Sequence, residues 1–318
     1  MKVRALATLL VVVALAASLA GCSINRFAAN GIGNALAGGQ DVFATDNDPE
    51  LVREALPFGL KTIESLLATV PRNRNLLLAA CRGFTQYGVA FVQSDADYIE
   101  SADYDHAKDL RERALRLYLR ARDYGVRGLD LAHPGIGRAL SINPDSAAAR
   151  LTKKDLDMLY WVAAAWGSAI GVGKDHPELL ADIGVVRSLM NRGLALDPAY
   201  DYGAIHEAMI VLEAVPAMMG GSLERARQHY DQSLALSHGK RASTFVTLAE
   251  NVSVQTQNRK EFAELLERAL AIDPDLDPPN RLANLIVQKK ARWLLAHADE
   301  LFLDEPTDSP LPQDDSKR

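Results

Sequence analysis

Two short stretches carry residue types that could do chemistry. The stretch Gly171–Asp175 (GVGKD) has the glycines and the lysine of a phosphate-binding loop. Such a loop also needs a glycine where Ser168 stands, and a Ser or Thr for magnesium where Asp175 stands. His206-Glu207 begins like the zinc-protease motif, but Ile210 occupies the place of its second histidine. Neither stretch therefore predicts nucleotide or zinc chemistry.

No other catalytic motif is present in the sequence. It lacks the G-x-S-x-G of serine hydrolases and the glycine fingerprint of dinucleotide-binding proteins. Its seven histidines are scattered, whereas metal centres need His or Cys ligands at close spacing. An acidic run is interpreted as a solvated helix or loop, with a cation or partner contact as the alternative: Asp95, Asp97, Glu100, Asp103 and Asp105. We therefore predict no catalytic residue, no metal and no cofactor, and no enzyme.

Cys22 is the residue with the clearest predicted modification. Lys2 and Arg4 precede a small and apolar run that ends at Gly21, the order of a secretory signal peptide. Leu19-Ala20-Gly21-Cys22 resembles the bacterial lipobox, in which the cysteine is acylated and becomes the first residue of the mature protein. Several acyl chains give stable membrane attachment, whereas one chain binds only marginally. The alternative is an ordinary signal peptide with an incidental Cys22.

Lipidation would place the mature chain on a membrane surface, facing a space outside the cytoplasm. Ser23 follows the cysteine, and by resemblance to enterobacterial sorting this favours the outer membrane. Loss of residues 1–21 removes two cations and takes the formal charge from −6 to −8. Nucleic-acid binding needs clustered cations, so we expect no nucleic-acid partner. Cys81 then has no partner for a disulfide, and its apolar surroundings predict a buried thiol.

The elements that must position these residues are helices. Apolar residues recur at steps of three and four along most of the chain, and alternating strand patterns are nearly absent, which predicts an all-α protein. We divide the chain into a signal peptide (1–21), a flexible tether (22–48), a single all-helical domain (49–303) and a disordered tail (304–318).

The helices show signs of a repeat. Four segments end alike, at Asn143-Pro144, Asp197-Pro198, Ser237-His238 and Asp273-Pro274, and their spacing approaches the 34-residue period of tetratricopeptide repeats. In such repeats the Asp-Pro stops one helix and opens the next. We predict a helical hairpin array with degenerate repeats; the alternative is that the shared pattern is only a common helix ending.

One segment, from Asp155 to Ile170, is apolar on all sides, which predicts a central helix buried on every face. It is too short to cross a bilayer. Trp161 and Trp166 could line an apolar ligand cavity on this helix; the alternative is that they pack in the core.

Several motifs together resemble the T-component family of TRAP transporters, the tetratricopeptide-like lipoproteins of some tripartite ATP-independent periplasmic transport systems. The resemblance covers roughly residues 40 to 303, and its motifs are Leu159–Gly167, Arg192–Pro198, Gly203–His206, Gly220–Ala226, Asn280–Asn284 and Ala291–Leu295.

The resemblance implies a non-catalytic, lipid-anchored periplasmic protein. It implies a periplasmic solute-binding protein as partner, a homotrimer with ligand-sized channels, and a solute that is hydrophobic or bears a carboxylate. Arg281 and Asn284 could face such a channel, since Arg suits bidentate carboxylate recognition; the alternative is that they brace the helix ends. Two other functions stay open: a repeat-type adaptor lipoprotein in cell-envelope assembly, and an enzyme with a dispersed site.

Overall fold

The computed structural model describes residues 30–31 and 40–303, and within these residues every regular element is a helix. The predicted all-α class is therefore confirmed. The N-terminal half runs through these elements: α2 (Gln40–Ala44), α3 (Pro49–Thr69), α4 (Arg74–Tyr87), the π-helical turn η1 (Gly88–Gln93), α5 (Ser94–Ile99), α6 (Tyr104–Ala132), α7 (Ile136–Ile142), α8 (Pro144–Ala149) and α9 (Leu156–Val172).

The C-terminal half continues with short and medium helices: α10 (Pro177–Leu180), α11 (Ile183–Leu196), α12 (Ala204–Glu213), α13 (Leu223–Ser237), α14 (Ala242–Leu248), the π-helical turn η5 (Ala249–Ser253), α15 (Arg259–Leu270), α16 (Arg281–Ala296) and α17 (Ala298–Leu301). Short 3₁₀ turns join several of them, including η3 (Tyr200–Gly203). None of the helices in the described part of the chain is both long and apolar enough to cross a membrane.

Local chemistry explains where several helices begin. Asp48 caps α3 by accepting hydrogen bonds from the backbone N–H groups of Glu50 and Leu51, and Pro49 follows at the first helical position. Asn143 caps α8 in the same way. All four repeat-like endings lie at the end of a helix. Only the first of them opens another α-helix directly, so the expected stop-and-start rule holds there and not at Asp197-Pro198, where a 3₁₀ turn follows.

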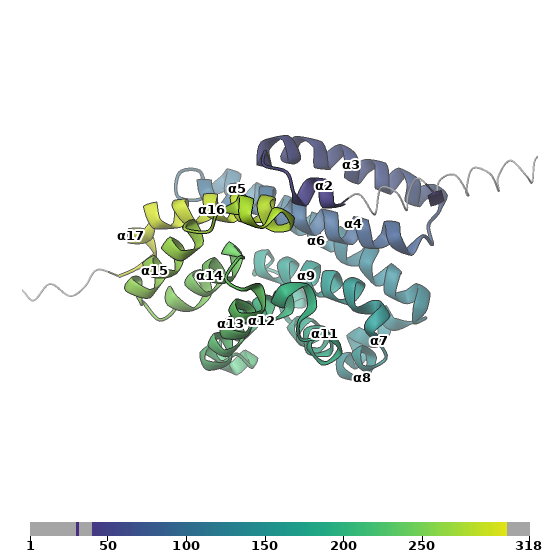
Figure 1. Ribbon diagram of the computed structural model, residues 1–318. Helices are drawn as coiled ribbons and strands as arrows, with labels where there is room; N and C mark the ends of the chain where they lie inside the picture. The colour runs from purple at the N-terminus through teal and green to yellow at the C-terminus, as the bar shows by residue number, and fades with distance from the viewer. Residues whose placement is uncertain (1–29, 32–39, 304–318) are drawn as a thin grey trace, which may run out of the picture.

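Two hydrophobic cores hold the helices together. The N-terminal core is built around α4, α6 and α9, which pack on one another, and α11 covers α9. The C-terminal core lies between α13, α14, α15 and α16. α12 contributes to both cores, and Leu282 and Ile286 of α16 reach back to the N-terminal core. Figure 1 shows the result: α16 lies beside α5 and α2, so the end of the chain returns to its beginning.

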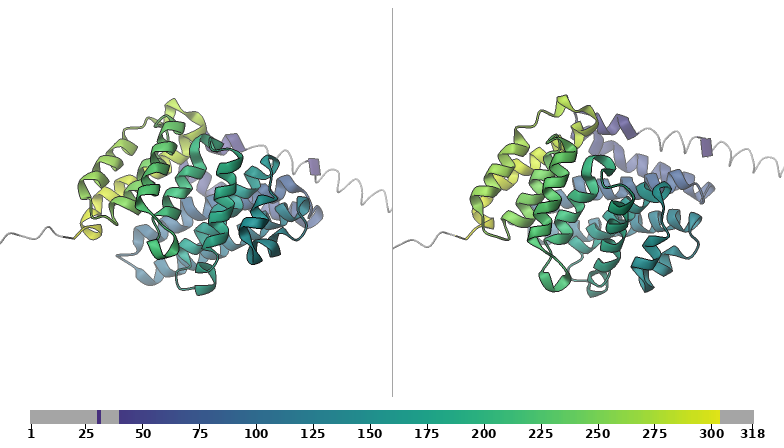
Figure 2. Two further views of the ribbon diagram at one scale, coloured as in Figure 1. Left: turned by 90° about the horizontal axis from the view of Figure 1, so that it is seen from below. Right: turned by 60° about the horizontal axis from the view of Figure 1, so that its bottom comes forward.

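The C-terminal half has a layered arrangement. Seen from below in Figure 2, the green helices of this half stand side by side in front of the purple helices of the N-terminal half. The elements between them are α9 and α12, which touch α4 and α14 respectively.

α9 is the central helix that the sequence predicts, with one correction. Most of its residues are buried, among them Leu159, Val162 and Ala163. Burial is not complete on every face, because Tyr160, Trp161, Ala164 and Ser168 stay partly exposed. These four positions follow helical spacing and form one stripe, so one face of α9 is partly exposed, and we call it the half-open stripe.

Candidate functional site

The half-open stripe of α9 supports a cluster of aromatic rings. The rings of Tyr160 and Trp161 meet edge to face with their centroids 5.1 Å apart. Tyr200, from η3, lies against Tyr160 with a centroid separation of 5.2 Å, and its hydroxyl donates to Asp157 at 2.9 Å. Burial and the neighbouring Glu207 raise the pKa of Tyr160, so its hydroxyl stays protonated and can donate a hydrogen bond.

Arg82, from α4, lies over this cluster. Its guanidinium carbon is 5.4 Å from the centre of the Trp161 ring. Its Nε atom is buried and has no hydrogen-bond partner, and Arg82 forms no ion pair with any described residue. Arg53, Arg74 and Arg281 also have a buried Nε without a hydrogen-bond partner, but each of them pairs with a carboxylate, whereas Arg82 does not. An anionic ligand would therefore satisfy Arg82. A carboxylate fits best, because its two oxygens match the guanidinium fork.

A second arginine, Arg241, interacts electrostatically with Tyr160. Arg241, just before α14, donates to the side chain of Asp201 at 2.9 Å and to its backbone oxygen at 2.8 Å. Burial opposes its charge, but Asp201 and Glu207 outweigh this effect and raise the pKa of Arg241. Glu207, from α12, accepts hydrogen bonds from Ser243 at 2.9 Å and Thr244 at 3.2 Å. Burial raises the pKa of Glu207 despite the nearby Arg241.

Backbone strain is concentrated beside this arginine. Asp201 (φ 42°) and Tyr202 (φ 54°) both adopt the left-handed conformation, and Gly203 (φ 90°) follows them. A bulky residue such as tyrosine is rarely found there, and such strain persists only when neighbouring contacts hold it. Arg241 supplies these contacts through its two bonds to Asp201. The interior cluster, which we define as Arg82, Tyr160, Trp161, Glu207 and Arg241, is therefore a pre-organised site.

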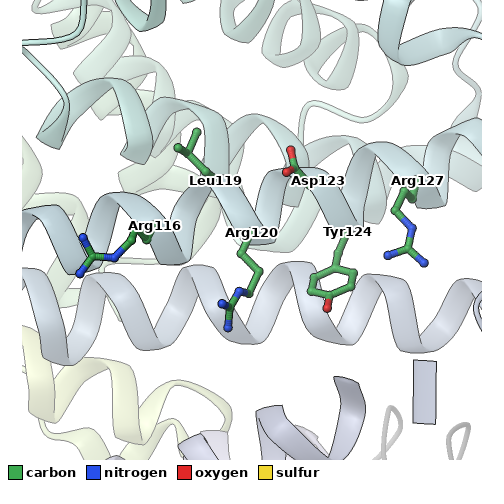
Figure 3. Close-up of a pocket in the computed structure, with 6 residues that line it drawn as sticks. All are labelled: Arg116, Leu119, Arg120, Asp123, Tyr124 and Arg127. Atoms are coloured by element: carbon green, nitrogen blue, oxygen red, sulfur yellow. The ribbon is translucent and has the colours of Figure 1, made fainter. Parts of the chain in front are cut away.

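The structure also has a surface groove outside this cluster. A groove of about 500 Å³ runs along α6, and Figure 3 shows the arginine and tyrosine side chains that line it, from Arg116 to Arg127. Tyr124 donates to Glu64 at 2.8 Å, and Arg120 lies 3.6 Å from the same carboxylate. This groove is open to solvent, and Arg116 and Arg120 are 67% and 47% exposed. Arg241 of the interior cluster is only 15% exposed, and charges that are shielded from water interact more strongly, so the interior cluster is the stronger candidate.

The residues singled out in the sequence are not all brought together. Trp161 belongs to the interior cluster, whereas Trp166 is a core residue with 6% exposure. The indole N–H of Trp166 donates to Asp182 at 3.0 Å, and Arg122 lies 5.1 Å over its ring. The two tryptophans thus occupy different faces of α9, and only Trp161 reaches the half-open stripe.

Arg281 and Asn284 are engaged in bonds within the chain. Asn284 is 2% exposed, accepts from the backbone N–H of Ala242 at 3.0 Å and donates to the oxygen of Lys240 at 2.9 Å. Arg281 donates to the oxygen of Thr45 at 3.1 Å and pairs with Asp275 at 2.8 Å. These contacts are the ones expected if Arg281 and Asn284 brace the helix ends, which is the alternative to facing a channel. Cys22, with the signal segment and the tail, lies outside the described residues.

Sequence reasoning missed Arg82, Tyr160, Glu207 and Arg241. Tyr160 directly precedes Trp161 in an apolar run, so this pair of aromatic residues was a signal that could have identified Tyr160. Arg82 directly follows the apolar run that ends at Cys81, and a charge in that position is a weak signal of an inward-facing cation. Glu207 stood out only in the incomplete zinc-protease motif, and nothing in the local pattern marks Arg241, because their proximity depends on how α12 meets the segment before α14.

Two other expectations can be compared with the structure. Cys81 is fully buried, as predicted, and burial raises the pKa of its thiol. The acidic run is less solvated than expected: Asp95 pairs with Arg53 at 2.6 Å, Glu100 pairs with Arg111, and burial raises the pKa of Asp97. Within the described residues, no three His, Cys, Asp or Glu side chains are grouped as a metal site would require.

A family model identifies the family of this chain. The family model of the TRAP transporter T-component matches residues 45–302, which is most of the chain. The chain is also 31% identical, over 304 residues, to an uncharacterized protein of Treponema pallidum (strain Nichols). That alignment covers 90% of this chain and 94% of the relative. The match spans both cores and every residue of the interior cluster, and the chain belongs to the TRAP transporter T-component family.

Proposed function

We propose that the chain is a lipid-anchored, periplasm-facing accessory protein of a TRAP-type uptake system, and that its interior cluster holds a carboxylate-bearing solute before it passes to a periplasmic solute-binding protein. Family membership supports the association with a TRAP system. The lipid on Cys22, the partner, the homotrimer and the outer-membrane location are parts of this proposal that follow from the lipobox and the family resemblance.

The observation that carries the proposal is the state of Arg82. It lies over Trp161, its Nε is buried without a partner, and Tyr160 offers a protonated hydroxyl in the same cluster. A solute carboxylate would satisfy the guanidinium, while the rings of Tyr160 and Trp161 would cover an apolar body. The acids Glu207 and Asp201 are already engaged by Ser243, Thr244 and Arg241, so they do not compete for Arg82.

Titration calorimetry with octanoate and benzoate as probes tests this site, with octylamine as the probe of opposite charge. We expect the carboxylates to bind and Arg82→Met to weaken them at least tenfold, roughly the loss of one charge-assisted hydrogen bond. Arg122→Met is the matched control, because Arg122 also lies over a tryptophan, Trp166, but outside the interior cluster. Equal loss in both variants, or binding of octylamine alone, would contradict a carboxylate site.

The transfer step needs a separate measurement. A TRAP-type solute-binding protein from the same organism would be mixed with the chain, and complex formation would be followed by native mass spectrometry, which also reports the oligomer. We expect a complex on a trimeric chain. A monomer that retains envelope-assembly factors and no solute-binding protein would favour the adaptor function instead.

A further inference from the structure

One end of the molecule carries a group of unpaired cations. Arg72 follows the turn between α3 and α4, Arg127 lies near the end of α6, Arg150 ends α8, and Lys154 precedes α9. All four residues are exposed, and none forms an ion pair with a carboxylate among the described residues. We call these four residues the cationic cap. Figure 1 shows α7, α8 and the α3–α4 turn at this same end of the molecule.

Hydrogen bonds between backbone and side chains connect the segments of the cap. Arg127 donates to the oxygen of Pro71 at 3.3 Å, which places it beside Arg72. Arg74 donates to the oxygen of Lys154 at 3.2 Å, so the start of α4 touches the segment before α9. Arg150 donates to the oxygen of Pro134 at 3.4 Å. These bonds involve carbonyl oxygens, so they leave the positive charges uncompensated.

The acids in this region are mostly engaged. Asp155 is 3% exposed and accepts hydrogen bonds from Arg74, Thr152 and His133. Asp145 accepts from the neutral hydroxyl of Ser188 and keeps its charge, but Asp145 and Asp130 together are outnumbered by the four cations of the cap. Asp130, one turn after Arg127, is the exposed acid nearest to the cap along α6. The cap is thus locally positive, although the chain as a whole carries a formal charge of −6.

The N-terminal segment meets the body at the cap. The side-chain N–H of Asn73 donates to the side-chain oxygen of Asn30 at 2.7 Å, and Asn73 is the neighbour of Arg72. Only seven residues, and therefore eight Cα-to-Cα steps, separate Asn30 from Cys22. A fully extended chain of that length reaches at most about 28 Å. A lipid on Cys22 would therefore keep the cap close to the membrane surface.

We propose that the cationic cap lies against anionic phospholipid headgroups and fixes the orientation of the body on its membrane. The inference rests on the lipid attachment at Cys22 in the proposed function, but not on the solute site. A basic surface is a common second signal beside an acyl anchor, and its attraction to anionic lipid falls off within a Debye length. With the cap toward the membrane, α16 and α17 point away from it and stay accessible to a periplasmic partner (Figure 1).

The chemistry of the two cysteines allows a direct test. Cys81 is fully buried, so a maleimide-headgroup lipid would attach to Cys22 in the chain from residue 22 to 318. The anchored protein would be placed on vesicles of phosphatidylcholine alone, or with phosphatidylglycerol added. Hydrogen–deuterium exchange of the segments 70–76 and 150–155 is the readout. We expect exchange at least several-fold slower on the anionic vesicles, and less slowing as salt is raised.

A matched pair of variants makes the test specific. Arg72→Glu, Arg150→Glu and Lys154→Glu together should abolish the slowing. Lys108→Glu, Lys260→Glu and Arg292→Glu change the charge equally with exposed residues of α6, α15 and α16 outside the cap, and should preserve it. Equal exchange on both vesicles, or equal loss in both variants, would overturn the proposal. Two further results would overturn it. One is exchange that anionic vesicles leave unchanged while an acidic protein binds in a cap-dependent way. The other is slowing of exchange by inorganic phosphate without any vesicle. Carboxylate binding, measured separately, would report on the solute site.

Discussion

The two cores of this protein are stabilised in different ways. The N-terminal core packs long apolar helices against one another, and its largest fully buried side chains include Leu76, Leu77, Leu129 and Leu159. The C-terminal core is smaller and rich in aromatic rings: Phe262 meets Phe302 edge to face at 5.1 Å, and Tyr230 meets Phe245 at 6.2 Å.

Buried amides distinguish the C-terminal core further. Gln288 is 3% exposed and donates to the oxygens of Ala269 and Ile272 at 3.0 and 2.7 Å. These carbonyls lie at the end of α15, where a helix lacks internal partners. Asn284, one turn earlier on α16, holds the connection before α14 in the same way. The N-terminal core depends mainly on apolar burial, whereas the C-terminal core also depends on one helix whose amides bind the ends of others.

This difference predicts how the molecule unfolds. Leu159→Ala should destabilise the N-terminal core by about 2–5 kcal/mol and Phe262→Ala the C-terminal core by about 3–5 kcal/mol, because both side chains are fully buried. Since α16 also contacts the N-terminal core through Leu282 and Ile286, we expect a single transition in both variants by calorimetry. A separate, earlier transition in Phe262→Ala would show that the two cores unfold independently.

A smaller effect is expected at Asn284. Asn284→Ala leaves the N–H of Ala242 and the oxygen of Lys240 without their partner, which should cost about 1–3 kcal/mol in the free energy of unfolding. Hydrogen exchange should rise at the start of α14 and not in α4 or α6. Arg281→Ala is the control on the same helix, because its bonds lie nearer the surface and should contribute less. An equal loss in the two variants would contradict a special role for the buried amides.

The sequence could predict the helices and the central position of α9, because local periodicity and apolar content determine both. It also identified Trp161, which lies on a helix whose pattern is continuous. The two arginines of the interior cluster come from α4 and from the segment before α14, and their approach depends on how distant helices pack. The same limit applies to Asn284 and Gln288. The sequence shows that each is a polar residue within a helix, but its hydrogen-bond partners are known only once the position of the neighbouring helix end is known.

The contact between α12 and α13, where the two cores join, predicts that the stability of the fold depends on pH. We call this contact the seam. α12 contributes to both cores, and His206 on α12 faces His229 on α13 with their Nδ1 atoms 2.8 Å apart. One ring must donate and the other accept, so the accepting histidine must be neutral and the bond is lost when both rings are protonated. Burial lowers the pKa of His206, and burial together with His206 lowers that of His229, with Arg225 adding to this effect and Glu213 opposing it.

A folded-state pKa below the unfolded value means that the unfolded chain binds more protons, so stability rises with pH and is lost as pH falls below about 6.5. Thermal unfolding from about pH 7.5 to about pH 5.5 should show this loss, as the smallest of the three effects. Carboxylates elsewhere also titrate toward the acid end, so the informative quantity is the difference from His206→Gln/His229→Gln, which keeps polar side chains but removes the protonation. If that variant loses as much stability on acidification as the natural chain, the histidine pair does not couple the seam to pH. If the natural chain loses more, the extra loss should coincide with faster hydrogen exchange in α12 and α13, where the two cores join.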